Sequence, residues 1–373
     1  MKVILCPDKF KSSLTAEEVC SAMAKGVCTV VPQAEIVRMP LADGGEGTLS
    51  VLESNLNAER ICVEVSGPLF RPVLAHYLLK GNRAYIEMAE ASGLPLLKTF
   101  ERSAMNTSTY GTGELIAHAI GRGAKEVFVL IGGSATNDGG CGMAEALGVR
   151  FLSHGGRNLT AIRGKDLARI KQIDTTALSA YKDITFVVLS DVRNPLTGPN
   201  GATHVFAPQK GAGVAEMEHL EKGFLNLAAC LGNGLEDQPG AGAAGGLGYG
   251  LMSFLGAEIR SGVNTLLHML NFSEQLDSAN LILTGEGKLD HQTMSGKVVA
   301  GVVEAVGNRN IPIGIICGMC ENLPEIKREL RADWVVQLRD QASGFRDSMT
   351  NAARYVQQAA AQIAKEWRSG ADN

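Results

Sequence analysis

The chain has 373 residues, 45% of them hydrophobic, which exceeds the size at which one hydrophobic core usually stops growing, so we expect two domains. A formal net charge of −4, with Lys and Arg scattered among acidic residues, argues against nucleic acid as a partner. No apolar run is long enough to cross a bilayer, and the first residues do not form a signal peptide. The sequence therefore predicts a soluble, cytoplasmic protein with no membrane partner.

Both ends of the chain alternate short apolar strands with helical patterns. Residues 2–6 predict a buried strand, and the capping-box spacing of Thr15 and Glu18 predicts the start of the helix that follows. Such alternation favours a parallel sheet with helices on both faces. Further elements of this kind are strands at 35–39, 281–284, 311–317 and 334–338, and helices at 48–55, 297–306, 324–330 and 348–368.

The pattern changes from Arg60 onward. A strand at 61–65 is followed by runs at 73–80 and 83–88 that a Gly-Asn break separates, which is typical of a β-hairpin. A helix at 113–120 and strands at 127–131 and 184–189 come next. We therefore predict an α/β protein in which residues 1–59 and 281–373 form one doubly wound parallel-sheet domain. Residues 60–280 form an inserted α/β domain with a mixed sheet.

Eight cysteines occur at irregular positions, which fits reduced thiols rather than a disulfide framework. Cys317 and Cys320 form a CxxC pair, but no second Cys or His pair lies near them in sequence, so a closed zinc site is not favoured. The cysteines within apparent strands or helices resemble small buried hydrophobic residues. These are Cys6, Cys20, Cys28, Cys62 and Cys230.

A glycine-walled loop at 132–140 (GGSATNDGG) joins an apolar strand to a helical stretch that begins at Cys141. The backbone N–H groups of Gly132 and Gly133 and the start of the helix could hold an anion, and Asp138 adds a carboxylate in the same turn. A magnesium nucleotide needs both features, so the loop indicates phosphoryl transfer. A tight structural turn would also use glycine, and the loop alone does not separate the two interpretations.

Acidic residues recur at the carboxyl ends of apparent strands, where ligands of open α/β sheets bind. We expect at least two of these acidic loops to meet at one site, although any single carboxylate could instead cap a helix. They comprise Asp8, the loop 43–47, Asp191 and the loop 285–290. Lysines beside glycine or at strand ends could reach a phosphate or a carboxylate as point charges. They comprise Lys9, Lys11, Lys210 and Lys297.

Two common nucleotide-binding motifs do not fit their required context. Residues 240–245 satisfy GxGxxG, but a polar loop rather than a strand precedes them, so dinucleotide binding is not favoured. Gly296 and Lys297 lack the upstream glycine and the following hydroxyl residue of a Walker A loop. A nucleotide-cofactor oxidoreductase and a non-catalytic sensor of small hydroxy acids remain as alternatives to a kinase.

The whole chain resembles the bacterial type-I glycerate kinases, because seven sequence blocks occur in the order of that family. The departures are Lys9 and Ser12, where Ser and Gly are more frequent, Ala207 in place of a frequent Gly, and Lys288 in place of a frequent Arg. None of them removes a carboxylate. The blocks are PDKFKSSL at 7–14, ADGGEGT at 42–48, GGSATNDGG at 132–140, DVRNPL at 191–196, PQKGA at 208–212, GAGAAGGLG at 240–248 and GEGKLDHQTMSGK at 285–297.

The resemblance implies a flavodoxin-like domain made of both chain ends. It also implies transfer of the ATP γ-phosphate to D-glycerate with Mg²⁺, giving 2-phosphoglycerate, with 3-phosphoglycerate as the alternative product. D-glycerate and ATP are then the small-molecule partners, and a homodimer is one candidate for the assembly.

The expected roles follow from these matches and from the strand ends. Asp191 is the candidate general base, with Lys11 and Asn194 as further catalytic residues. Candidate magnesium ligands are Asp43, Asp138 and Asp290. Candidate substrate- and nucleotide-binding residues are Asp8, Gly132, Gly133, Ser134, Asn137, Lys210, Gly285, Glu286 and Lys297.

Overall fold

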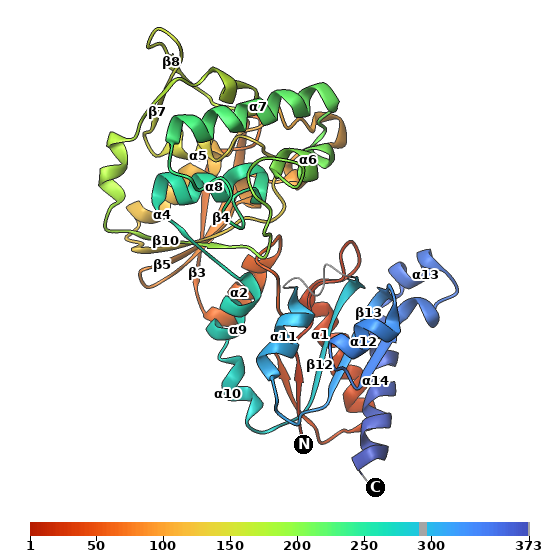
Figure 1. Cartoon of the computed structure of the whole chain (residues 1–373). Helices are drawn as coiled ribbons and strands as arrows, with labels where there is room; N and C mark the ends of the chain where they lie inside the picture. The colour runs from red at the N-terminus through yellow and green to blue at the C-terminus, as the bar shows by residue number, and fades with distance from the viewer. Residues whose placement is uncertain (291–296, 372–373) are drawn as a thin grey trace. The chain divides into compact units, whose positions relative to one another are not determined.

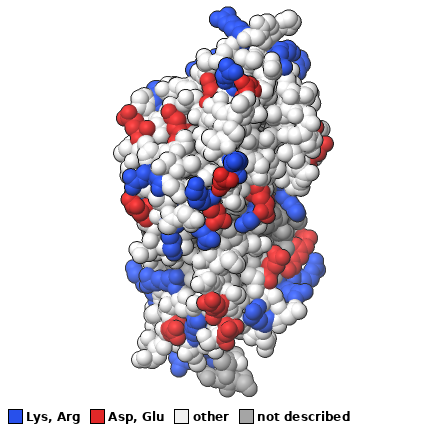
Figure 2. Space-filling model, turned by 90° about the vertical axis from the view of Figure 1, so that its left-hand side faces the viewer, with Lys and Arg blue, Asp and Glu red and all other residues white. Residues whose placement is uncertain are grey.

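The computed structural model describes residues 1–290 and 297–371 (Figure 1). The chain divides into two compact units. Unit 1 comprises Met1–Asp43 and Ser261–Asn373, and unit 2 comprises Gly44–Arg260. On the face drawn in Figure 2, Lys and Arg are interspersed with Asp and Glu. Within the described residues, no helix has the length and apolar character needed to cross a membrane.

Unit 1 contains a five-stranded parallel sheet with the strand order β14-β13-β12-β1-β2. When the strands are numbered along this unit alone, the order becomes 2-1-3-4-5, which is the flavodoxin-like arrangement. The register aligns Val3 with Ile36 on one side and with Leu281 on the other. The doubly wound domain predicted from both chain ends is thus confirmed. Its strands are β1 (Lys2–Leu5), β2 (Glu35–Arg38), β12 (Ala279–Leu289), β13 (Ile313–Cys320) and β14 (Trp334–Gln337).

Helices cover both faces of this sheet (Figure 1). The helix α1 begins with the predicted capping box, in which the Glu18 N–H donates to Thr15 Oγ1 and the Thr15 N–H donates to Glu18 Oε2. A Cβ on Gly26 would lie 2.2 Å from Gln357 O, so glycine allows α1 to approach α14 closely. The helices are α1 (Ala16–Val30) and α14 (Ala352–Ala371) on one face, α9 (Gly262–Met269), α10 (Phe272–Leu276), α11 (Val298–Val306) and α12 (Leu323–Glu329) on the other, and α13 (Phe345–Thr350) before α14.

Unit 2 contains a six-stranded mixed sheet with the order β11-β10-β6-β5-β4-β3. Strands β3, β4 and β5 pair antiparallel, whereas β5, β6, β10 and β11 run parallel, as the predicted mixed sheet requires. A second, three-stranded sheet has the order β8-β7-β9. The strands are β3 (Glu59–Ser66), β4 (Pro72–Lys80), β5 (Arg83–Glu87), β6 (Glu126–Leu130), β7 (Arg150–Leu152), β8 (Asn158–Leu159), β9 (Gln172–Asp174), β10 (Thr185–Leu189) and β11 (Glu258–Arg260).

One large apolar core, to which residues from β3 to α8 contribute, stabilises unit 2. The α-helices are α2 (Thr48–Leu56), α3 (Ala89–Ser92), α4 (Tyr110–Gly121), α5 (Cys141–Ala146), α6 (Ala202–Phe206), α7 (Val214–Leu231) and α8 (Ala243–Leu255). A short 3-10 helix, η5 (Pro208–Lys210), follows α6.

The division into units differs from the predicted domain boundaries at two places. Residues 44–59 belong to unit 2, because the Gly47 and Leu49 N–H groups at the start of α2 donate to the buried Glu87 of β5. Residues 261–280 belong to unit 1, where Val263 of α9 packs against Gly301 of α11. Local periodicity cannot reveal either contact, since each joins residues far apart in sequence.

The cysteine environments agree in part with the prediction. Cys6 and Cys20 are buried in unit 1. Cys28 and Cys62 are exposed, so the interpretation of those two as buried hydrophobic residues is wrong. Cys28 lies on the outer side of α1, and Cys62 lies on the strand at the edge of the mixed sheet.

Candidate active site

The carboxyl ends of three strands of unit 1 meet at the flavodoxin-like switch point, where the chain turns to opposite faces of the sheet. The Asp8 N–H, just beyond β1, donates to Gly285 O of β12 at 2.8 Å. The Leu41 N–H donates to Pro7 O at 2.9 Å, which holds the segment leading to Asp43 beside the same loop. Asp8, Asp43 and the start of the loop 285–290 are therefore neighbours in unit 1.

The electrostatics of Asp8 show that this cluster concentrates negative charge. Asp8 is 6% exposed and Glu286 is 5% exposed. The pKa of Asp8 is raised from 3.8 to about 7, mainly by burial and in addition by the nearby carboxylates of Asp43 and Glu286. A hydrogen bond from the Lys9 N–H to Asp8 Oδ1 opposes the rise. Carboxylates that repel one another in this way form an environment in which a cation is stabilised.

Lysines flank the same cluster. Lys297 Nζ lies 3.7 Å from Glu286 Oε2 and 3.4 Å from Asp290 Oδ1. Lys288 Nζ lies 3.3 Å from Asp290 Oδ2. Burial raises the pKa of Asp290, but the charges of Lys297 and Lys288 outweigh this effect, and the net shift is downward. Residues 291–296 of this motif lie outside the described residues.

Lys11 lies next to this loop through its backbone. A Cβ on Gly287 would lie 3.4 Å from Lys11 N, and the Lys11 side chain is exposed. Across residues 1–290 and 297–371, no three His, Cys, Asp or Glu side chains form a preformed metal centre. Mg²⁺ needs only one or two protein carboxylates when water and phosphate supply its other ligands, so the carboxylates of Asp8, Asp43 and Glu286 fit this ion.

The glycine-walled loop of unit 2 surrounds a buried lysine. Lys210, at the end of η5, is 1% exposed, and its Nζ donates to Ser134 Oγ at 2.7 Å and to Thr136 O at 2.6 Å. Burial lowers the pKa of Lys210 from 10.5 to about 7, although Asp138 opposes the shift. These two hydrogen bonds use both N–H groups of a neutral amine, whereas an ammonium group has a third N–H to donate.

Buried polar atoms without a hydrogen-bond partner lie in the same loop. Asn137 is fully buried, and neither its Oδ1 nor its Nδ2 has a partner within the described part of the chain. Thr136 Oγ1 also has no hydrogen-bond partner within the described residues. Leaving such groups unsatisfied costs about 1–3 kcal/mol each, so we expect a ligand or a buried water molecule to complete these hydrogen bonds.

Backbone geometry explains why glycines are needed here. A Cβ on Gly132 would lie 2.2 Å from the Cα of Gly45, so only glycine lets these two loops of unit 2 touch. A Cβ on Gly245 would lie 2.0 Å from Thr136 O. Of the other glycines in the GxGxxG match, Gly242 packs in the same way against Pro195 O, and Gly240 packs against the Ile259 side chain. This packing does not support dinucleotide binding by residues 240–245.

Asp138 lies beneath the loop and is engaged by the protein itself. It is fully buried, and its Oδ2 accepts hydrogen bonds from the Thr109 N–H, Thr109 Oγ1 and the Gly142 N–H, at distances from 2.7 to 3.2 Å. Burial raises the pKa of Asp138, and these hydrogen bonds oppose the rise. Its position favours a structural role, which fixes the start of α5, over the magnesium-ligand role that the sequence suggested.

Asp191 and Asn194 follow β10, which pairs with β6 in parallel so that Leu189 aligns with Leu130. Asp191 therefore lies at the carboxyl ends of the strands, the same side of the sheet from which the 132–140 loop starts. The Asn194 Nδ2–H donates to Asn200 O at 2.8 Å, so this side chain closes its own loop.

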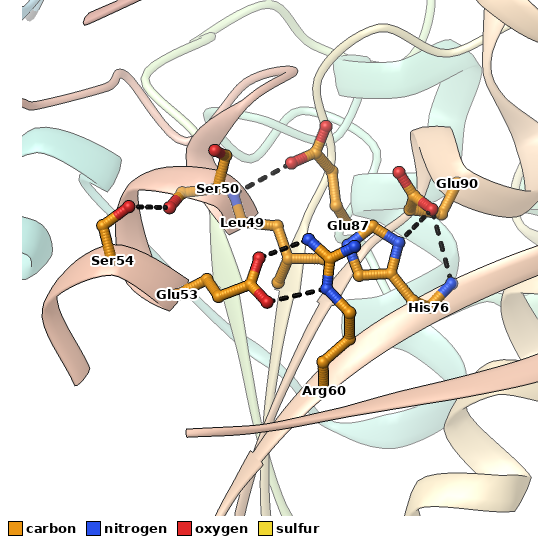
Figure 3. Close-up of polar contacts among 8 residues, drawn as sticks. All are labelled: Leu49, Ser50, Glu53, Ser54, Arg60, His76, Glu87 and Glu90. Atoms are coloured by element: carbon orange, nitrogen blue, oxygen red, sulfur yellow. Dashed lines mark hydrogen bonds and ion pairs between the residues drawn. The ribbon is translucent and has the colours of Figure 1, made fainter. Parts of the chain in front are cut away.

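Glu87 is a buried residue that the sequence analysis did not single out. Its Oε2 accepts from the Leu49 N–H at 3.0 Å (Figure 3). Its Oε1 accepts from the Gly47 N–H at 2.9 Å, and the two hydrogen bonds fix the start of α2. The signal that could have revealed it is an acidic residue at the carboxyl end of a buried strand. Glu87 positions the loop that contains Gly45 and Glu46 against Gly132 and Gly133.

The structure thus groups the predicted residues into two sets, one in each unit. Unit 1 brings together Asp8, Asp43, Gly285, Glu286, Asp290 and Lys297, with Lys11 adjacent. Unit 2 brings together Ser134, Asn137 and Lys210 beside Gly132 and Gly133, with Asp138 beneath them.

A carboxylate cluster at a flavodoxin-like switch point and a glycine-rich loop around a buried lysine together define a candidate phosphotransferase of the α/β class. The family model described as "Glycerate kinase family" matches residues 3–368, and the chain belongs to this family. It is therefore an enzyme, an ATP-dependent kinase.

Related sequences and a solved structure agree with this assignment. The chain is similar to a glycerate kinase of Bacillus subtilis, with 39% identity over 98% of this chain and 97% of the relative. It is 41% identical to glycerate 2-kinase of Escherichia coli K12 over 85% of each chain. A crystal structure from Salmonella typhimurium LT2, assigned to glycerate kinase 2, has a TM-score of 0.84 and 37% identity and covers 100% of both chains.

Proposed function

We propose that this protein transfers the γ-phosphate of ATP to D-glycerate and forms 2-phosphoglycerate, with Mg²⁺ as cofactor. The similarity to a relative named glycerate 2-kinase supports the substrate and the position of transfer. The observation that carries the proposal is the buried Lys210 against the loop that contains the unsatisfied Asn137, since the anionic oxygens of a ligand would accept hydrogen bonds from the Lys210 ammonium group and from Asn137 Nδ2.

Each residue set has a defined task in this proposal. In unit 2, Lys210, Ser134, Asn137 and the backbone N–H groups of the glycine loop bind an anionic group of the substrates. In unit 1, Asp8, Asp43 and Glu286 hold the magnesium ion, which neutralises charge on the phosphoryl oxygens when it is bound.

Lys297 and Lys11 add positive charge beside the carboxylates of unit 1 and orient phosphate or carboxylate oxygens. Asp290 holds Lys297 in place and accepts hydrogen bonds from water molecules bound to the magnesium ion.

Product analysis tests the activity and its position. We expect phosphorus NMR of a reaction with ATP, Mg²⁺ and D-glycerate to show the phosphomonoester of the 2-hydroxyl, with coupling to the C2 proton. A signal coupled to the two C3 protons would assign 3-phosphoglycerate instead. ATP consumption that does not depend on glycerate would contradict the proposed substrate.

Asp191→Asn tests the assignment of the general base. We expect kcat to fall about a hundredfold, because a positioned base contributes at least this much, while the KM for ATP stays the same. Steady-state kinetics with saturating Mg²⁺ measure both values. Asp183→Asn, in the turn before β10, serves as the control, since this exposed carboxylate precedes the same strand at its other end. A kcat near that of the wild type would place the base elsewhere.

A further inference from the structure

The strand β3 is one of the two edge strands of the six-stranded sheet and pairs with β4 without a register shift. Just beyond β3, the Gly67 N–H donates to Arg71 O at 2.7 Å in the continuation of the same register. Bonded pairs alternate in an antiparallel ladder, so the odd-numbered residues of β3 bond to β4. The N–H and C=O groups of Arg60, Cys62 and Glu64 therefore point away from the sheet.

Ser66 supports this alternation. Its N–H donates to Glu114 Oε2 at 2.6 Å rather than to β4. The outward backbone groups of the edge thus end at Glu64, and the edge that can pair with another strand comprises residues 60–64. Proteins usually cover such an edge or protect it with charge, because it is a template for pairing with another chain.

The side chains of the same three residues share one face of the strand. Arg60, Cys62 and Glu64 are exposed, whereas Ile61 and Val65 on the opposite face are buried in the core of unit 2. Figure 3 shows Arg60 on this face between Glu53 of α2 and the His76 side chain of β4. The outward backbone groups and the exposed side chains of these three residues thus lie along the same edge of the sheet.

When β3 pairs with β3 of a second copy of the chain, the charged side chains favour one register. A two-fold antiparallel pair centred on Cys62 places Arg60 of each copy opposite Glu64 of the other. A shift by two residues in either direction places Arg60 opposite Ser66 or opposite Cys62 and removes both charge pairs. Opposite charges in directly facing positions stabilise strand pairing, and like charges there destabilise it.

Arg60 can make this contact without losing the partner that it already has. Glu53 accepts from Nε and from one terminal nitrogen of Arg60, and the guanidinium side chain is 49% exposed. The other terminal nitrogen has two further N–H donors for a second carboxylate.

We propose that β3 is a homodimer interface, in which two copies of this chain pair residues 60–64 antiparallel about Cys62 and join their mixed sheets into one. The three outward residues of each strand exchange backbone hydrogen bonds with the other copy. Two Arg60–Glu64 pairs then flank two facing Cys62 thiols. This inference goes beyond the proposed function and does not depend on the substrate.

Charge reversal tests the register. We expect wild-type protein to sediment as a dimer in analytical ultracentrifugation, and Glu64→Arg to weaken dimerisation on the order of ten- to a hundredfold, because it places like charges opposite each other twice. The double variant Arg60→Glu with Glu64→Arg should restore the dimer. Arg157→Glu, an exposed charge reversal in the turn between β7 and β8, is the control. Far-UV circular dichroism and kinase activity confirm that each variant folds.

Cys62 provides an independent measurement. Facing Cα atoms in a bonded antiparallel pair lie about 5.5 Å apart, so a short bis-maleimide should link the two thiols into a covalent dimer on a denaturing gel. The linked species should disappear in Cys62→Ser and persist in Cys28→Ser, which removes the other exposed thiol. A monomeric wild-type protein, a dimer that Glu64→Arg leaves intact, or linkage that survives Cys62→Ser would each overturn the proposal.

Discussion

Lys210→Met is expected to lower kcat/KM for ATP about a thousandfold, which corresponds to about 4 kcal/mol of lost transition-state stabilisation. The lysine is fully buried, and two of its hydrogen bonds are already made to Ser134 Oγ and Thr136 O. The third N–H of the ammonium form is therefore the one available to a substrate oxygen. Methionine preserves most of the buried volume but removes this donor and its charge.

The same substitution should make the ligand-free protein more stable at pH 6. Lys210 has a pKa of about 7 in the folded chain and 10.5 as its ordinary value, so the unfolded state binds the extra proton between these values. The free energy of unfolding of the wild type then rises with pH across this window, and below pH 7 the folded state carries the full cost of up to about 5 kcal/mol. Thermal unfolding at pH 6 and pH 10 should show a gain for Lys210→Met at pH 6 that shrinks at pH 10.

Calorimetry distinguishes anion binding from a purely structural role of Lys210. At pH 8 we expect wild-type protein to take up a proton when the anionic substrate binds, which titrations in buffers of different ionisation enthalpy detect. Lys210→Met should show no such uptake. Lys165→Met is the matched control, because Lys165 Nζ donates to Asn106 Oδ1 in the same unit but is only half-buried. Unchanged turnover and proton uptake in Lys210→Met would remove this lysine from the site.

The strand order of unit 1 shows how far the sequence predicts the fold. Apolar runs at 2–6 and 281–284 predict strands, but periodicity does not say that β1 and β12 are neighbours, with Val3 beside Leu281. The resemblance to a family supplied the flavodoxin-like arrangement, and the structure confirms it. Long-range contacts, such as Glu87 with the start of α2, decide which unit a segment joins, and no local pattern encodes them.

The residue types in the sequence indicated where a candidate site lies, but they did not indicate the role of each residue in it. Glycine spacing marked the loop at 132–140, but Asp138 and Asn137, one residue apart, have different surroundings. The Asp138 carboxylate accepts hydrogen bonds from Thr109, Gly140 and Gly142, whereas both polar atoms of the Asn137 side chain have no partner within the described residues. Burial and hydrogen-bond partners distinguish a structural acid from a ligand-binding residue, and both arise only when remote segments pack.

Asp8→Asn is expected to lower kcat about a thousandfold and to remove most of the effect of Mg²⁺ on stability, because it takes away one of the neighbouring carboxylates at the switch point of unit 1. The pKa of Asp8 is about 7 in the folded chain against an ordinary value of 3.8. Between these values the folded state keeps a proton that the unfolded state has lost, so the free energy of unfolding falls as pH rises through this window. Above pH 7 the loss reaches up to about 4 kcal/mol.

Asparagine has no charge to bury, so without metal we expect Asp8→Asn to unfold at a higher temperature than wild type at pH 8 and at nearly the same temperature at pH 4. Adding Mg²⁺ at pH 8 should stabilise wild type and leave Asp8→Asn almost unchanged, since the ion offsets a carboxylate repulsion that the variant lacks. Asp277→Asn, an exposed acid of the same unit, should respond to Mg²⁺ as wild type does. Equal stabilisation of Asp8→Asn and wild type by Mg²⁺ would place the ion away from Asp8, and a wild-type stability that does not change between pH 5 and pH 8 would contradict the raised pKa.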